Sequence, residues 1–243
     1  MFKVLAITNR HLCNTDFLTH IKNICMLNKK IQSTFKANNF NNINFTETFY
    51  KKYDKSNILY DGNTCDSYYK NLGKLKNVSS ISIVLREKDL NEYDYEILAS
   101  KVMKICEEYN TECILHTYYH KALKLGCDKI HLPLHILKSN PNIVKKFNTV
   151  GVSIHSIEES ICAENLGASY ITAGHIFDTN CKKGLPGKGI DFLKNIVNSV
   201  DIHVYAIGGI SCSNIPQVIG TGAYGVCIMS GLMNTDNPEK FFY

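Results

Sequence analysis

Short apolar runs separated by longer amphipathic stretches dominate the hydrophobic pattern of this chain. Eight runs predict strands, at residues 4–8, 81–85, 112–116, 129–132, 149–153, 169–174, 202–207 and 224–229. Most of them do not alternate apolar and polar residues, which is typical of strands buried on both faces. Apolar residues at helical spacing, as in 90–108, predict helices between the strands. This order predicts an α/β protein with a (β/α)8 TIM barrel, whose loops after the strands meet at one end.

The length of the chain fits one such barrel. Its 243 residues are close to the roughly 250 of a typical barrel, so we expect a single domain over residues 1–243. A segment at about 31–76 does not fit, because it is rich in Asn, Lys and Tyr and lengthens the connection between strand 1 and strand 2. We expect it to form a polar insertion outside the catalytic face.

Composition narrows the choice of partners. The net charge of +5 is mild and the 27 Lys and Arg are spread along the chain, so we expect a small anionic substrate and no nucleic acid. No apolar run is long enough to span a membrane, and the first residues turn polar too soon for a signal peptide. The ten cysteines form no CxxC pair, which favours free thiols in a reducing cytoplasm. A homo-oligomer is compatible with the sequence, which does not fix the oligomeric state.

The loop at 174–189, GHIFDTNCKKGLPGKG, follows a predicted strand and carries the strongest candidate for catalysis. Free imidazole titrates at roughly pH 6.5, so His175 can both take and give a proton. A lone histidine is more often structural, but this one shares a glycine-rich loop with Thr179 and Lys182. We therefore predict that His175 is catalytic and that Thr179 and Lys182 bind the substrate.

Glycines after the last two strands predict a phosphate site. Gly208 and Gly209 follow the run at 202–207. Met229 ends the run at 224–229, and Ser230 follows it. Backbone N–H groups can approach an anion closely at glycines, and barrels often bind phosphate at this pair of loops. The alternative is that the glycines only allow tight turns.

Three more polar side chains are predicted to bind the substrate. Arg86 and Lys88 follow the second strand in LREKDL, and Ser153 ends the fifth. Arginine offers a planar fork for carboxylate or phosphate, although a solvated loop with an internal Arg–Glu pair is the alternative. The third and fourth strands end in histidines, with no carboxylate to bind Mg²⁺. These histidines lie on different loops and lack the local spacing of zinc ligands. We expect no metal.

With these motifs in order, the chain resembles the thiamine phosphate synthase / TenI superfamily over residues 3–10 and about 80–233. The resemblance implies the same barrel. It also implies one of two activities. The synthases join a pyrimidine diphosphate to a thiazole phosphate, with Mg²⁺ held by aspartates, and the TenI-type thiazole tautomerases use a histidine to convert a carboxythiazole phosphate to its aromatic tautomer.

The departures from the synthase pattern decide the interpretation of the sequence. The synthases carry metal aspartates in two places, where this chain has His116-Thr117 and the stretch Leu132-Pro133-Leu134-His135-Ile136. Gly174-His175 replaces their usual Gly-Pro. The resemblance then implies a thiazole tautomerase of thiamine biosynthesis, with His175 as proton shuttle, a phosphorylated thiazole as substrate and no cofactor. Arg86 or Lys182 would face the substrate carboxylate. Two alternatives stay open: a thiamine phosphate synthase, which would need Mg²⁺, and a non-catalytic regulator that binds a thiamine precursor.

Overall fold

The computed structural model describes residues 2–41 and 78–242, and in them eight parallel strands close into a barrel in the order β1 to β8. This confirms the predicted TIM barrel. The strands are β1 (Phe2–Ile7), β2 (Val78–Leu85), β3 (Cys113–His116), β4 (Lys129–Pro133), β5 (Thr149–Ile154), β6 (Tyr170–Gly174), β7 (His203–Ile207) and β8 (Gly225–Ile228).

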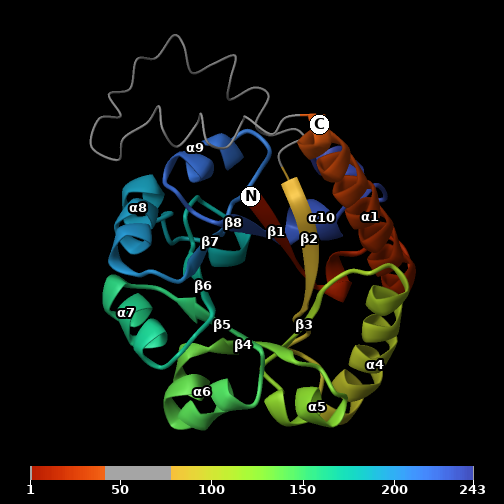
Figure 1. The fold of residues 1–243 in the computed structure, drawn as a ribbon, viewed down its shortest axis with the longest axis horizontal. Coiled ribbons are helices and arrows are strands. Elements are labelled where there is room, and N and C mark those ends of the chain that lie inside the picture. The colour runs from red at the N-terminus through yellow and green to blue at the C-terminus, as the bar shows by residue number, and fades with distance from the viewer. Residues whose placement is uncertain (1, 42–77, 243) are drawn as a thin grey trace.

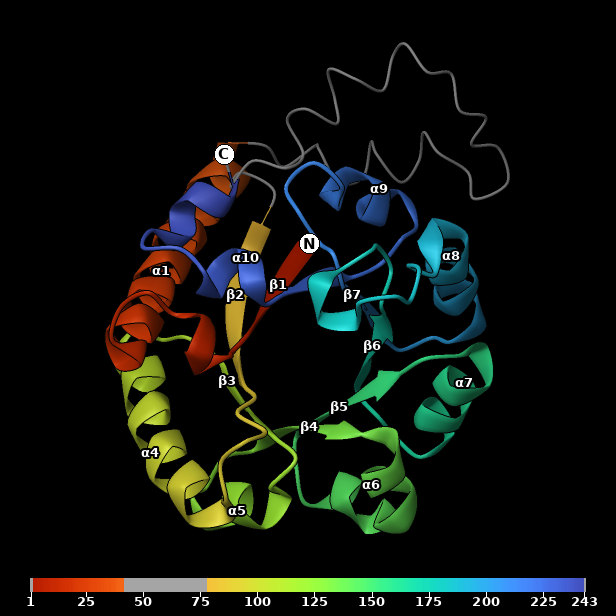
Figure 2. The same cartoon turned by 180° about the vertical axis from the view of Figure 1, so that it is seen from behind.

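A helix follows each strand, and the helices form a ring around the barrel (Figures 1 and 2). They are α1 (Phe17–Asn41), α4 (Glu92–Glu108), α5 (Tyr119–Lys124), α6 (Leu134–Ser139), α7 (Ile157–Asn165), α8 (Gly189–Ser199), α9 (Ile215–Gly220) and α10 (Ser230–Met233). Short 3-10 helices lie at Arg10–Leu12, Pro141–Lys145, Asn180–Lys182 and Pro238–Phe242. Among the described helices none has the length and apolarity needed to cross a membrane.

Both faces of the strands are buried, each against a different core. The outer face packs on the helices in a large apolar cluster that includes Val4, Ile83 and Leu115. Inside the barrel a second cluster forms from Leu5, Ile7, Val84, Ile114, Tyr170, Tyr205 and Cys227. Because apolar side chains are needed on both faces, the strands read as continuous apolar runs rather than alternating ones.

Helix α1 is longer than the sequence pattern indicates. It continues to Asn41, so residues 31–41 belong to a helix and not to the polar insertion expected from about residue 31. Inside α1 the fully buried Asn28 donates to Thr111 Oγ1 at 3.0 Å and accepts from the Ile81 amide at 2.8 Å, which fixes the helix to β2. The rest of the expected insertion, 42–77, lies outside the described residues, and the single-domain organisation stays a prediction.

The last helix of the barrel is replaced in part by the C-terminal segment. Helix α10 spans only Ser230–Met233, and the 3-10 helix Pro238–Phe242 follows it. Phe242 is buried, and Lys30 of α1 forms an ion pair with Glu239 at 2.5 Å. The end of the described chain therefore covers the gap beside α1 that a full-length eighth helix would fill.

One glycine inside the barrel permits a close contact that matters for the site above it. A Cβ atom at Gly151 of β5 would lie 2.0 Å from the Tyr170 ring of β6. We expect Gly151→Ala to destabilise the fold by about 1–3 kcal/mol, as overpacked cores usually do, and to lower the thermal midpoint by several degrees. An unchanged midpoint in calorimetry would show that the ring can move at no cost and would contradict this account.

Candidate functional site

The carboxyl ends of the strands bring the predicted site residues to one end of the barrel. This follows from closure, because parallel strands in a barrel all end on the same side. The residues gathered there are Arg86 and Lys88 after β2, Ser153 in β5, His175, Thr179 and Lys182 after β6, Gly208 and Gly209 after β7, and Met229 and Ser230 after β8. They fall into three groups with different surroundings.

The loop after β2 is braced against β1 by the carboxylate of Glu87, which is 2% exposed. Glu87 accepts from Thr8 Oγ1 at 2.6 Å, from the Arg10 amide at 3.1 and 3.2 Å, and from the Arg10 guanidinium at 3.2 Å. Thr8 Oγ1 also accepts from the Arg86 amide at 2.9 Å. An internal Arg–Glu pair does exist here, but it uses Arg10, so the Arg86 guanidinium remains available for a ligand.

Arg86, Lys88 and Lys182 form a group that we call the cation cluster. None of the three makes an ion pair with the described part of the chain. Partial burial, together with repulsion from Arg86 and Lys182, lowers the pKa of the Lys88 ammonium. Burial also lowers the pKa of Arg86. Arg86 and Lys182 therefore place like charges beside Lys88, and an anionic ligand would compensate them.

A hydrogen-bonded chain inside the barrel fixes the direction of the Ser153 hydroxyl. The buried Tyr170 hydroxyl lies 3.0 Å from His131 Nδ1, its only hydrogen-bond partner among the described residues, so we assign it as the donor. His131 Nε2–H then donates to Ser153 Oγ at 2.8 Å, and Thr172 Oγ1 donates to the same oxygen at 3.3 Å. With its oxygen accepting twice, Ser153 keeps its own O–H to donate to a ligand.

The histidines of this interior are uncharged. Burial, with the nearby Arg86 cation, lowers the pKa of His131 from 6.5 to about 3. His116 stacks on His131 with ring centroids 5.4 Å apart, and burial lowers its pKa well below 6.5. A neutral polar floor beneath a cationic rim suits a neutral heteroaromatic ring that carries an anionic group.

Sequence reasoning missed this interior network. It considered His116 and His131 only as metal ligands, and it did not consider Tyr170 at all. The available signal was three large polar side chains inside otherwise apolar predicted strands, which have to find hydrogen-bond partners when the barrel closes.

The loop after β6 is held by its own contacts. His175 Nε2 lies 3.2 Å from the Leu185 carbonyl, to which it donates, so Nδ1 is left as an acceptor. His155 Nδ1 lies 3.0 Å from the carbonyl of Gly174 and steadies the start of the loop. Thr179 Oγ1 accepts from the Cys181 amide at 3.3 Å and caps the 3-10 turn. This local role for Thr179 differs from the predicted substrate contact.

The glycines after β7 are required by packing. Gly208 and Gly209 have φ of 98° and 65°, and Cβ atoms there would lie 2.3 Å from His175 Cβ and 2.5 Å from the Asp178 carbonyl oxygen. The two glycines therefore let the loop after β6 lie close to the loop after β7. This packing role is compatible with the alternative that the glycines only allow tight turns. The amides of Gly209 and Ser230 donate no backbone hydrogen bond within the described residues. These donors remain available for an anion.

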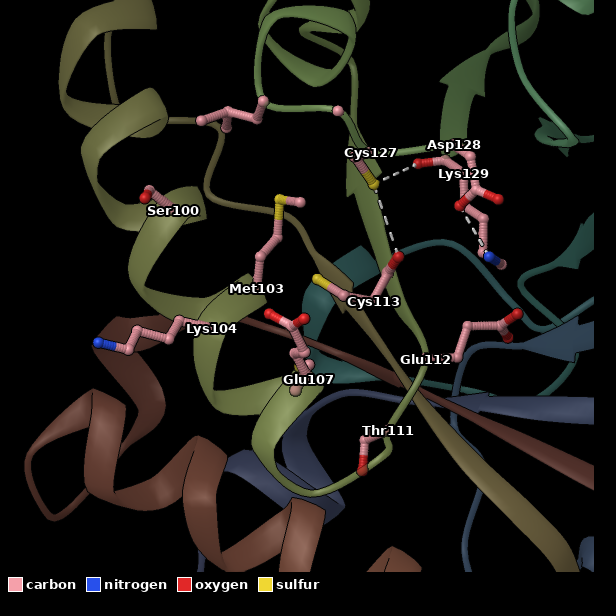
Figure 3. A pocket seen from close by; sticks show the side chains of 13 residues that line it. Ser100, Met103, Lys104, Glu107, Thr111, Glu112, Cys113, Cys127, Asp128 and Lys129 are labelled. Carbon is pink, nitrogen blue, oxygen red and sulfur yellow. Dashed lines mark hydrogen bonds and ion pairs between the residues drawn. The ribbon is translucent and has the colours of Figure 1, made fainter.

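Two pockets lie at opposite ends of the barrel. One of about 240 Å³ opens at the carboxyl ends of β2 to β4, where Lys88, His116, Thr117 and His135 line it. A larger one of about 580 Å³ lies at the amino ends of β3 and β4, beside α4 (Figure 3). The larger pocket has mixed charge and contains none of the predicted site residues, whereas the smaller one lies at the carboxyl ends of the strands and includes Lys88.

The residues of the smaller pocket do not fit the Mg²⁺ that the resemblance to synthases implies. Magnesium prefers carboxylate oxygens, whereas Thr117 and His135 line this pocket at the ends of β3 and β4. The one lining carboxylate, Glu87, is engaged by Thr8 and Arg10. The described residues hold no group of three or more His, Cys, Asp or Glu that could bind a metal ion.

The fold is a TIM barrel, and the cation cluster lies at the carboxyl end of its strands. The family model described as thiamine monophosphate synthase matches residues 67–232, and the chain belongs to that family. A thiamine-phosphate synthase from Clostridium acetobutylicum is 36% identical over 155 residues, covering 63% of this chain and 73% of the relative. One from Pyrococcus horikoshii is 33% identical over 165 residues, covering 65% and 77%.

A solved structure agrees on the fold. Thiamine phosphate pyrophosphorylase from Pyrococcus furiosus superposes with a TM-score of 0.66 at 21% identity, covering 99% of this chain and 92% of that one. The relatives named synthase overturn the main prediction from the sequence. The assignment as a TenI-type thiazole tautomerase is wrong, and the alternative that the sequence left open, the synthase, is favoured.

The interior network makes a prediction about pH. Because the pKa of His131 falls from 6.5 to about 3 on folding, the folded state resists a proton that the unfolded state accepts. The contribution of His131 to the free energy of unfolding is fully present above pH 6.5. It is lost as the pH falls toward 3, by on the order of 1 kcal/mol per pH unit. We expect denaturant titrations between pH 7 and pH 4 to show that the free energy of unfolding falls less steeply with pH in His131→Asn than in the parent chain. The same slope as in the parent chain would refute the assignment.

Proposed function

We propose that this chain joins a pyrimidine diphosphate to a thiazole phosphate, the activity of the synthase branch. The observation that carries the proposal is the pairing of two anion-binding regions around a neutral floor. The cation cluster lies after β2 and β6, and the free amides of Gly209 and Ser230 lie after β7 and β8. One region suits a diphosphate and the other a single phosphate. The names of relatives at 30–36% identity support the same reaction.

The reaction can be written in terms of this chain's own residues. The bond between the pyrimidine methylene carbon and the diphosphate oxygen breaks, and the electron pair leaves with the diphosphate. The thiazole nitrogen forms the new bond to that carbon and becomes a thiazolium. Arg86, Lys88 and Lys182 would hold the leaving diphosphate, because cations placed where negative charge develops lower the barrier.

The neutral floor would orient the pyrimidine. Ser153 donates outward because His131 and Thr172 occupy its oxygen, so it suits a ring nitrogen that accepts a hydrogen bond. The amides of Gly208, Gly209, Met229 and Ser230 would bind the thiazole phosphate. Holding both rings in line converts a bimolecular reaction into one within a complex.

A coupling assay tests the proposal. Purified protein with both substrates should form thiamine phosphate and inorganic diphosphate in equal amounts, as measured by liquid chromatography. Arg86→Ala should lower kcat/KM by at least about tenfold, since it removes a charge-assisted contact to the leaving group. Lys183→Ala changes an exposed lysine next to the cluster and is the matched control. No product from folded protein that binds both substrates would contradict the proposal.

His175 has a different part in this reaction than in a tautomerase. Coupling removes no proton, so we propose that His175 positions the loop through its bond to the Leu185 carbonyl. His175→Gln retains a hydrogen-bond donor at the same reach and removes the imidazole ring. Coupling should stay within about tenfold with an unchanged pH profile, whereas loss of a general base typically costs ~10²–10⁴-fold.

A second histidine variant serves as the control for His175→Gln. The exposed His120 of α5, changed to Gln, reports any general effect of removing a histidine. A hundredfold loss for His175→Gln alone, with a flattened pH profile, would assign His175 to proton transfer instead of positioning.

A further inference from the structure

The pocket of about 240 Å³ at the ends of β2 to β4 holds positive charge and lacks an available carboxylate. Lys88 lines it, and Thr117 and His135 stand on its β3 and β4 sides. The oxygens of Glu87 are turned to Thr8 and Arg10, with hydrogen bonds of 2.6 to 3.2 Å, and the side chain is almost fully buried. No acidic group is left in the described pocket lining to hold a cation.

The charges around the pocket also favour an anion over a cation. Burial, together with repulsion from Arg86 and Lys182, lowers the pKa of Lys88. Burial, together with His131, Arg86 and Lys88, lowers the pKa of His116. His116 Nδ1 lies 2.6 Å from Thr117 Oγ1, so these two polar groups satisfy each other. A divalent cation entering here would be repelled, whereas a polyanion would be attracted.

We infer that this pocket and the cation cluster bind a diphosphate group directly, without a divalent metal ion. The inference rests on the proposed function for the choice of diphosphate as the ligand. Lys88 and Arg86 take the charge-neutralising role for which the synthase pattern uses magnesium and aspartates. Lysine and arginine both form strong charge-assisted hydrogen bonds to phosphate oxygens.

Isothermal titration with inorganic diphosphate tests the inference. In a buffer containing a chelator, we expect saturable binding to one site. Added Mg²⁺ should weaken the apparent affinity, because the metal captures diphosphate in solution. Binding that is absent in chelator and appears only with Mg²⁺ would overturn the inference.

Two lysine variants separate this site from general electrostatics. Lys88→Ala should weaken diphosphate binding by at least about tenfold, since it removes a charged contact from the pocket. Lys183→Ala removes the same formal charge from another exposed position, one that does not line the pocket, and should change the affinity less than about twofold. Equal losses in both variants would show that net charge, and not the pocket, binds the anion, and would overturn the inference.

A converse variant tests whether carboxylates at the pocket make diphosphate binding depend on Mg²⁺. Thr117→Asp with His135→Asp places two carboxylates at the pocket, and Thr117 has a φ of 68°, a conformation that aspartate tolerates. Diphosphate affinity in chelator should fall at least tenfold, and Mg²⁺ should now raise it. An identical Mg²⁺ response in the parent chain and a folded double variant would refute the inference.

These binding results are independent of turnover. Diphosphate binding in chelator without coupling activity would uphold the metal-free site and refute the proposed synthase function. Coupling activity together with diphosphate binding that requires Mg²⁺ would uphold the synthase function and refute the metal-free site.

Discussion

Closure of eight short strands into a barrel forces every inward side chain to find its partners inside a narrow space. Most inward positions solve this with apolar packing, as in the cluster around Leu5 and Tyr205. Near the carboxyl ends the inward residues are polar, and His131 bridges Tyr170 and Ser153. A buried polar group without a partner is costly, so this chain of hydrogen bonds fixes both the tautomer of His131 and the direction of the Ser153 hydroxyl.

The same burial separates neutral from charged parts of the site. The two interior histidines stay uncharged because desolvation and nearby cations oppose a proton. Around the floor, the charges of Arg86, Lys88 and Lys182 lack partners within the described residues. Glu87 serves the architecture, since it joins the loop after β2 to β1 through Thr8 and Arg10. The arrangement leaves net positive charge at the rim, where an anion can bind.

His175 led the interpretation of the sequence to the wrong branch of the family. His175 in a glycine-rich loop suggested proton transfer, and the missing metal aspartates favoured a tautomerase over a synthase. In the structure the His175 ring donates to the Leu185 carbonyl, which is a loop contact. The relatives named synthase favour the other branch. The absence of aspartates then bears on how the diphosphate is held rather than on which reaction occurs.

The sequence by itself determined the barrel and the end at which the site lies. Eight apolar runs of strand length, each followed by polar residues, carry that information locally, and all eight strands were predicted. The sequence also placed Arg86, Lys88 and Ser153 at the ends of the second and fifth strands, where the structure has them; their role in binding stays a prediction. Only the tertiary structure decided that Glu87 pairs with Arg10, that α1 extends to Asn41 and that His131 joins Tyr170 to Ser153. Those contacts join different strands and loops, and their partners are chosen by barrel closure, which no local pattern encodes.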